Sequence, residues 1–96
     1  MLTLSISPKA EADLIDIWLY VAEDQPVNAD RLLDRLNDKA LSLAETPGMG
    51  AARPSLSKGL KCFPVGSYIL YYRTTISELQ LVRVLSASRD MENIHW

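Results

Sequence analysis

The fold of this chain is decided by residues 59–90, GLKCFPVGSYILYYRTTISELQLVRVLSASRD, which are dense in β-branched, aliphatic and aromatic side chains. Gly66 and the mostly polar residues 74–77 divide this stretch into three apolar segments. The segments are residues 60–65, 67–74 and 78–86. Apolar segments of this composition between turn residues are typical of β-strands. Because the connections between them are short, the sequence predicts three consecutive antiparallel strands.

The three predicted strands differ in their expected places in the sheet. Pro64 has no backbone N–H to donate to a neighbouring strand, so residues 60–65 are expected to be irregular or at an edge. Residues 78–86 carry apolar side chains on both faces, among them Leu79 and Val82. A strand of this kind is expected to have neighbours on both sides.

The N-terminal residues predict a strand and then a helix. Residues 2–6 alternate apolar and polar side chains, which is typical of a short half-buried strand. Ser7 can cap the free N–H groups of a helix, and Pro8 at the first helical position loses no hydrogen bond. Apolar residues then recur at helical spacing over 10–21 until Pro26 ends the helix.

A second helix is predicted for residues 29–44, and Thr-Pro-Gly at 46–48 ends it. Residues 49–59, rich in Gly, Pro, Ser and Ala, are expected to form a loop. The order β-α-α-β-β-β predicts an α+β fold, in which a helical hairpin packs on one face of a mostly antiparallel sheet. At 96 residues the chain is expected to be one domain, residues 1–96.

The net charge of −2 hides an asymmetry between the two halves of the chain. Residues 1–48 hold nine acidic and four basic side chains, whereas residues 49–96 hold three acidic and six basic ones. Two solvated surfaces of opposite sign explain this, and so does a basic sheet face that meets an acidic partner or a nucleic acid. A sequence-specific nucleic-acid binder would be more basic overall, so no such binding is expected.

Several classes of protein are excluded by composition. No secretory signal and no apolar run of roughly 20 residues is present, so a cytoplasmic protein without a membrane span is expected. The single cysteine, Cys62, excludes an internal disulfide and is expected to be a buried thiol. One histidine and one cysteine far apart in the sequence predict neither a metal site nor a cofactor.

Arginines and tyrosines of the sheet half are candidates for a binding surface. They are Arg73, Arg83, Arg89, Tyr68, Tyr71 and Tyr72. Such side chains together can hold phosphates and stack on bases, whereas strand tyrosines more often pack with a wet hydroxyl. Because Arg83 lies in a strand that reads as buried, it is expected to need a carboxylate or carbonyl partner.

Three side chains of the first predicted helix have an ordinary structural explanation as well as a functional one. Asp13 and Asp16 lie three apart on the first predicted helix and are interpreted as exposed acids. Trp18 shares the apolar stripe of that helix, so we expect it to pack rather than to serve as an exposed anchor.

Four motifs in this order together resemble the ParE branch of the ParE/RelE toxin superfamily. They are AEADL at 10–14 with Ile17-Trp18 and Tyr20, the helix end from Leu43 through Pro47-Gly48-Met49-Gly50, GSYILYY at 66–72, and LVRVL at 81–85 followed by Arg89-Asp90. The resemblance covers nearly the whole chain and implies the small α+β fold expected above. It also implies a toxin of a type II toxin–antitoxin pair, neutralised by a ParD-like antitoxin.

The resemblance leaves the target open. ParE-like members are described as poisoning DNA gyrase in its cleaved-DNA state without being enzymes, and this is the activity expected here. RelE-like members instead cut mRNA on the ribosome. A third alternative is a member that only binds its antitoxin. The antitoxin is expected to cover apolar surface along the helical hairpin and to add a strand to a sheet edge. The chain itself is expected to form a homodimer or a toxin–antitoxin hetero-oligomer.

The residues favour the gyrase alternative. Arg89 matches the C-terminal arginine of the superfamily, but Ile69, Ser86 and Ser88 stand where it commonly has Arg, His and Arg. For a ribonuclease, Arg89 and His95 are therefore the remaining catalytic candidates. The candidates for binding a partner are Arg73, Arg83, Arg89, Trp18 and Tyr71.

Overall fold

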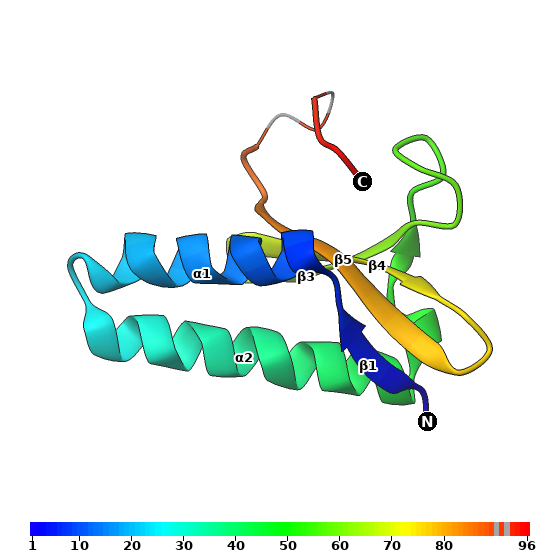
Figure 1. The fold of residues 1–96 in the computed structure, drawn as a ribbon, viewed down its shortest axis with the longest axis horizontal. Helices are drawn as coiled ribbons and strands as arrows, with labels where there is room; N and C mark the ends of the chain where they lie inside the picture. Colours follow the sequence, from blue (N-terminus) through cyan, green and yellow to red (C-terminus); the bar gives the residue numbers. More distant parts are fainter. Residues whose placement is uncertain (90, 92) are drawn as a thin grey trace.

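Two helices pack on one face of a five-stranded sheet in the computed structural model, which describes residues 1–89, 91 and 93–96 (Figure 1). The elements are β1 (Thr3–Ile6), α1 (Pro8–Ala22), α2 (Pro26–Glu45), the 3-10 turn η1 (Pro47–Met49), β2 (Ala51–Ala52), β3 (Lys61–Val65), β4 (Tyr68–Thr74) and β5 (Glu78–Ser86). This arrangement confirms the predicted α+β fold.

The sheet has the order β1-β5-β4-β3-β2. Strands β2 to β5 are antiparallel to their neighbours, and β1 joins the sheet parallel to β5. The predicted interior place of 78–86 is confirmed, because β5 lies between β1 and β4. Pro64 lies in the part of β3 that has no described strand on its outer side, since β2 pairs only with Lys61 and Cys62.

The helix starts follow the sequence signals. Pro8 begins α1, and the Ser7 Oγ accepts a hydrogen bond from the N–H of Ala10 at 3.0 Å. Pro26 begins α2 after Gln25, so the proline that ends the first helix also starts the second. A connection this short makes the helices run side by side as a hairpin (Figure 1).

Both faces of the sheet are covered by apolar packing. The larger cluster lies between the helices and the sheet and includes Leu36, Leu70 and Tyr72. A second cluster lies on the opposite face and includes Leu60, Cys62, Tyr71, Val82 and Leu85. Four partly buried side chains pack against this second cluster: Leu56 from the loop before β3, and Met91, Ile94 and Trp96 from the end of the chain. The predicted burial of Cys62 is confirmed.

The segment between α2 and β3 departs from the prediction. Residues 49–59 were expected to form a loop throughout, but they contain the short strand β2. Tyr72 explains the order of this segment, because its buried hydroxyl donates to the carbonyl of Pro47 at 2.7 Å and accepts from the N–H of Gly50 at 3.0 Å. A Cβ on Gly50 would lie 2.1 Å from that hydroxyl, so only glycine fits here.

Replacing Tyr72 by phenylalanine removes the hydroxyl, so the Pro47 carbonyl and the Gly50 N–H lose this hydrogen-bond partner. We expect Tyr72→Phe to lower the free energy of unfolding by about 1–2 kcal/mol in urea denaturation. The matched control is Tyr20→Phe, whose side chain is 74% exposed and which should change little. Equal losses in the two variants would contradict this account.

Tyr72 also predicts how stability responds to alkaline pH. Burial raises its pKa above the ordinary value of 10.0, although the Gly50 hydrogen bond opposes this. The contribution is therefore fully present below pH 10 and is lost as pH rises through the folded-state pKa. Urea denaturation at several alkaline pH values should show a weaker pH dependence in Tyr72→Phe. Some dependence should remain, because burial raises the pKa of Tyr71 as well.

Candidate functional site

The candidate site is built around an irregularity in β5. Tyr71 lies opposite Arg83 and Tyr72 lies opposite Leu81, so Val82 is an extra residue in β5. A bulge of this kind interrupts the alternation of a strand. Leu81 and Val84 consequently both join the cluster under the helices, whereas Val82 packs on the other face. Arg83 is thereby kept out of the apolar layer under the helices.

Arg83 forms a two-pronged ion pair with Asp13 of α1. Its Nε donates to Oδ2 at 2.7 Å and its Nη2 donates to Oδ1 at 2.9 Å. The two side chains are only 12% and 10% exposed, so water screens this pair weakly. The hydrogen bonds that Arg83 donates to Asp13 raise the pKa of the guanidinium above its ordinary value, which favours the cation further. This confirms the predicted carboxylate partner of Arg83.

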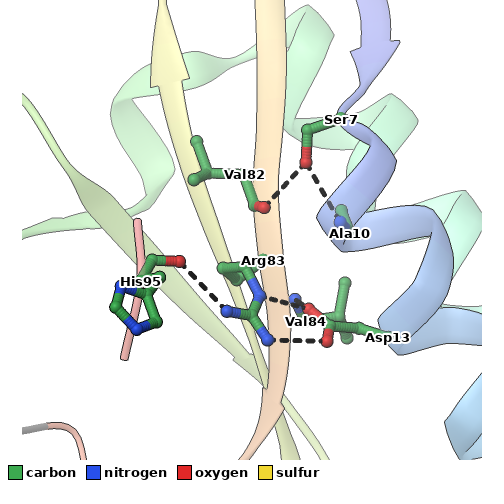
Figure 2. A network of polar contacts seen from close by, with 7 residues as sticks. All are labelled: Ser7, Ala10, Asp13, Val82, Arg83, Val84 and His95. Carbon is green, nitrogen blue, oxygen red and sulfur yellow. Dashed lines mark hydrogen bonds and ion pairs between the residues drawn. The ribbon is translucent and has the colours of Figure 1, made fainter. Parts of the chain in front are cut away.

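Asp13 also completes the edge of β5. Strand β1 ends at Ile6 opposite Leu81, so within the described chain no strand lies beside residues 82–86 on that side. The Val84 N–H donates to Asp13 Oδ2 at 3.0 Å, and the Ser7 Oγ donates to the Val82 carbonyl at 2.8 Å. Two side chains thus replace the missing strand (Figure 2). The interpretation of Asp13 as an exposed acid is wrong, because it is buried as a capping carboxylate.

The guanidinium of Arg83 has a third contact on its other side. Nη1 donates to the main-chain carbonyl of His95 at 3.0 Å. Figure 2 shows Arg83 between Asp13 from α1 and His95 near the end of the chain. The His95 side chain is exposed, so only its backbone takes part in this network.

The structure distributes most of the candidate arginines and tyrosines over separate places, although Arg89 and Tyr68 line the same groove. Arg73 donates to the Lys58 carbonyl at 3.1 Å and to the Ser57 Oγ, and so holds the loop before β3. Tyr71 is buried on the second face, where its ring centroid lies 4.7 Å from that of Trp96. Tyr68 and Tyr72 belong to the helix side. Burial of Tyr71 and Tyr72 confirms the packing interpretation of these strand tyrosines.

The remaining candidates lie nearer the surface. Trp18 is half-buried, and its Nε1 donates to Asp30 Oδ1 at 2.8 Å, which links α1 to α2. Arg89 is exposed and lines a groove of about 320 Å³ between α1 and the end of β5, together with Asp16 and Tyr20. His95 is not among the residues that line this groove.

A second hollow lies between the helices and the sheet. It has a volume of about 240 Å³, is lined mainly by apolar side chains such as Leu14 and Leu33, and carries Asp34 and Asn37 as polar members. The exposed apolar side chains of α1 include Ile15 and Leu19, four residues apart, at 55% and 57% exposure. The helical hairpin therefore presents apolar surface that could be covered by another molecule.

The described residues contain neither a metal-binding cluster nor a membrane-spanning helix. In residues 1–89, 91 and 93–96, no three His, Cys, Asp or Glu side chains lie close enough together to hold a metal ion. Neither described helix is long and apolar enough to cross a membrane.

Removing the Asp13 carboxylate leaves Arg83 and the Val84 N–H without their partner in a mostly dry place. We expect Asp13→Ala to lower the free energy of unfolding by about 2–4 kcal/mol. Asp16→Ala, which removes an exposed carboxylate one turn further along α1, should change it by less than about 0.5 kcal/mol. Urea denaturation measures both, and a loss below about 0.5 kcal/mol for Asp13→Ala would refute the capping role.

Comparison with known proteins agrees with this architecture. The family described as "ParE toxin of type II toxin-antitoxin system, parDE" matches residues 4–91. Toxin ParE1 of Caulobacter vibrioides is 31% identical over 88 residues, which is 88% of each chain. A structure titled "Chromosomal ParDE TA system from P. aeruginosa" superposes with a TM-score of 0.78 at 24% identity, over 90% of this chain and 96% of that one.

A more distant relative shares the fold. The toxin–antitoxin complex RelBE2 from Mycobacterium tuberculosis contains a chain with a TM-score of 0.67 at 23% identity, and the match covers 88% of this chain and 96% of that one. At such identities the two structures show the fold alone, but the family match and the Caulobacter relative extend over nearly the whole sequence. This chain belongs to the ParE toxin family of type II toxin–antitoxin systems.

Proposed function

We propose that this chain inhibits DNA gyrase and is neutralised by a ParD-like antitoxin, without being an enzyme. The observation that carries the proposal is the match to the ParE family over residues 4–91. The use of the arginines supports it, because Arg73 and Arg83 are bound by the chain's own loop and by Asp13. A ribonuclease needs cations that face a phosphate instead. A gyrase inhibitor would act in the cytoplasm.

The outer face of the helical hairpin is the proposed docking surface for the antitoxin. Ile15 and Leu19 lie on one exposed face of α1. The apolar hollow beside Leu14 and Leu33, between the helices and the sheet, is a second place that can accept side chains of a partner. The neighbouring ParDE structure from P. aeruginosa is titled as a toxin–antitoxin system, which supports a partner of this kind. Half-buried Trp18 would border this surface rather than anchor it.

If the antitoxin also adds a strand, the outer edge of β1 is the edge best suited to it. The free part of β5 is already capped by Ser7 and Asp13. The free part of β3 contains Pro64, which has no N–H to donate. Strand β1 lies at the end of the sheet order and contains no proline.

A RelE-like ribonuclease is the second candidate, because the RelBE2 chain shares the fold and because exposed Arg89 and His95 remain available to a substrate. Arg89 lines the groove beside α1 and His95 is not among the residues that line it, which favours the gyrase proposal over this alternative. A protein that binds its antitoxin and has no toxic activity is the third.

Purified chain should be assayed with DNA gyrase for supercoiling and DNA cleavage, and in parallel with translating ribosomes for mRNA cleavage. We expect lost supercoiling, accumulated cleaved DNA and intact mRNA. Cut mRNA with unaffected gyrase would replace the proposal by the ribonuclease alternative. Neither effect, with antitoxin binding retained, would make the chain an antitoxin-binding protein without toxic activity.

Antitoxin docking on α1 predicts a large effect of a single charge there. Leu19→Asp should weaken antitoxin binding about 100-fold, because a carboxylate would be buried in an apolar interface. Ile76→Asp is the matched control, since Ile76 lies fully exposed in the turn between β4 and β5. Isothermal titration calorimetry measures both affinities, and equal affinities would place the antitoxin elsewhere.

The basic sheet half, for which an acidic partner is one explanation, would suit an acidic tail of the antitoxin. Arg83 cannot test this idea, because charge reversal there would break the pair with Asp13. Arg89 is exposed and gives a fair test. Arg89→Glu should weaken antitoxin binding more at low salt than at high salt. Unchanged affinity at both salt concentrations would exclude an electrostatic contribution from Arg89.

A further inference from the structure

The end of the chain closes the second face of the sheet. The Trp96 ring lies 4.7 Å from the Tyr71 ring and is tilted by 59°. Met91 Sδ accepts a hydrogen bond from the Tyr71 hydroxyl at 3.4 Å, and Ile94 packs against the same cluster. These described residues, Met91, Ile94, His95 and Trp96, are called the closing residues below.

Arg83 is the polar link between the closing residues and the helical layer. Two of its nitrogens bind Asp13 of α1 and the third binds the His95 carbonyl, so one planar group is held from both sides (Figure 2). A guanidinium is rigid, and its donors cannot move independently. A rotation that weakens the contact with Asp13 therefore also misaligns Nη1 with the His95 carbonyl.

We propose that Arg83 is a positioning residue that couples helix α1 to the closing residues. A change in the position of Asp13 alters the orientation of the guanidinium, and this alters how Trp96 lies on Tyr71. Asp13 also lines the groove of about 320 Å³ beside α1, so a molecule bound there acts directly on this link. The coupling does not depend on the identity of the toxin's target.

Coupling of this kind acts in both directions, because the free energy that links the Asp13 contact to the Trp96 contact is the same whichever of them is lost first. Loss of Asp13 must loosen Trp96, and loss of Trp96 must loosen the guanidinium. A merely structural ion pair predicts something else: removing Asp13 would lower the unfolding midpoint, but Trp96 would keep its place in the molecules that stay folded. The two accounts are therefore separated by a probe of Trp96 in the folded protein.

Trp96 becomes a single fluorescent probe in a Trp18→Phe background, because these are the only two tryptophans. In that background Asp13→Asn, which keeps the size of the side chain and removes its charge, should raise acrylamide quenching of Trp96 about two- to threefold at a temperature where the protein is folded. Arg73→Met is the control, since the hydrogen bonds described for Arg73 go to Lys58 and Ser57 in the loop before β3 and not to the closing residues. It should leave quenching unchanged.

The comparison with Arg83→Met decides between the two accounts. If Arg83→Met releases Trp96 and Asp13→Asn does not, Arg83 merely holds the closing residues, and the coupling is refuted. If both variants release Trp96 to a similar degree, the coupling is supported. Should Arg83→Met fail to fold, Arg83→Lys replaces it, because lysine keeps the charge but cannot bind on both sides as a planar fork.

The reverse direction provides a second measurement in the otherwise unchanged protein. Trp96→Ala should speed hydrogen exchange of the Arg83 Nε proton about fivefold, as followed by ¹H–¹⁵N NMR. The indole proton of Trp18 is the internal control, because it bonds to Asp30 between the helices and should exchange as before. An unchanged Arg83 Nε signal in Trp96→Ala would overturn the proposal.

Discussion

The Asp13 carboxylate holds the helical layer to the sheet at the point where β1 has ended. It accepts three hydrogen bonds, two from the Arg83 guanidinium and one from the Val84 N–H. Without it, a cation and a backbone donor would face apolar surroundings, and the free edge of β5 would be open to pairing with another strand. The short β1 leaves the edge of β5 beyond Leu81 without a neighbouring strand, and Asp13 caps that edge together with Ser7.

Much of the fold could be predicted because the signals are local. Apolar periodicity and the Ser7-Pro8 start define α1, and turn residues such as Gly66, with a φ of 59°, separate the strands. The class of partner for Arg83 also follows from its burial. Its identity does not, because Asp13 lies 70 residues earlier and reads as one acid among several on a polar helix. The bulge sets the direction from which Arg83 meets Asp13, and no local pattern shows where a strand will carry an extra residue.

The same limit applies to the site. Sequence reasoning grouped arginines and tyrosines by residue type, whereas the structure distributes them according to their partners. Arg73 donates to the loop before β3, and Arg83 pairs with the Asp13 carboxylate that caps the edge of β5. Arg89 is exposed at the surface. Basic residues on a sheet therefore say little about nucleic-acid chemistry until their own contacts are known. In this member of the ParE family, Arg73 and Arg83 bind partners within the chain, and α1 keeps exposed apolar side chains such as Ile15 and Leu19.

The parallel pairing of β1 with β5 has a consequence for the order of events during synthesis. Ser7 meets Val82 across 75 residues of sequence, and the helices between them cannot bury their apolar stripes until the central strand exists. Contacts this distant in sequence form slowly. A nascent chain therefore emerges from the ribosome with its helical hairpin exposed and its sheet incomplete. During that interval a partner that recognises the hairpin can bind before the domain has closed, so translation itself gives such a partner the first opportunity to engage the toxin.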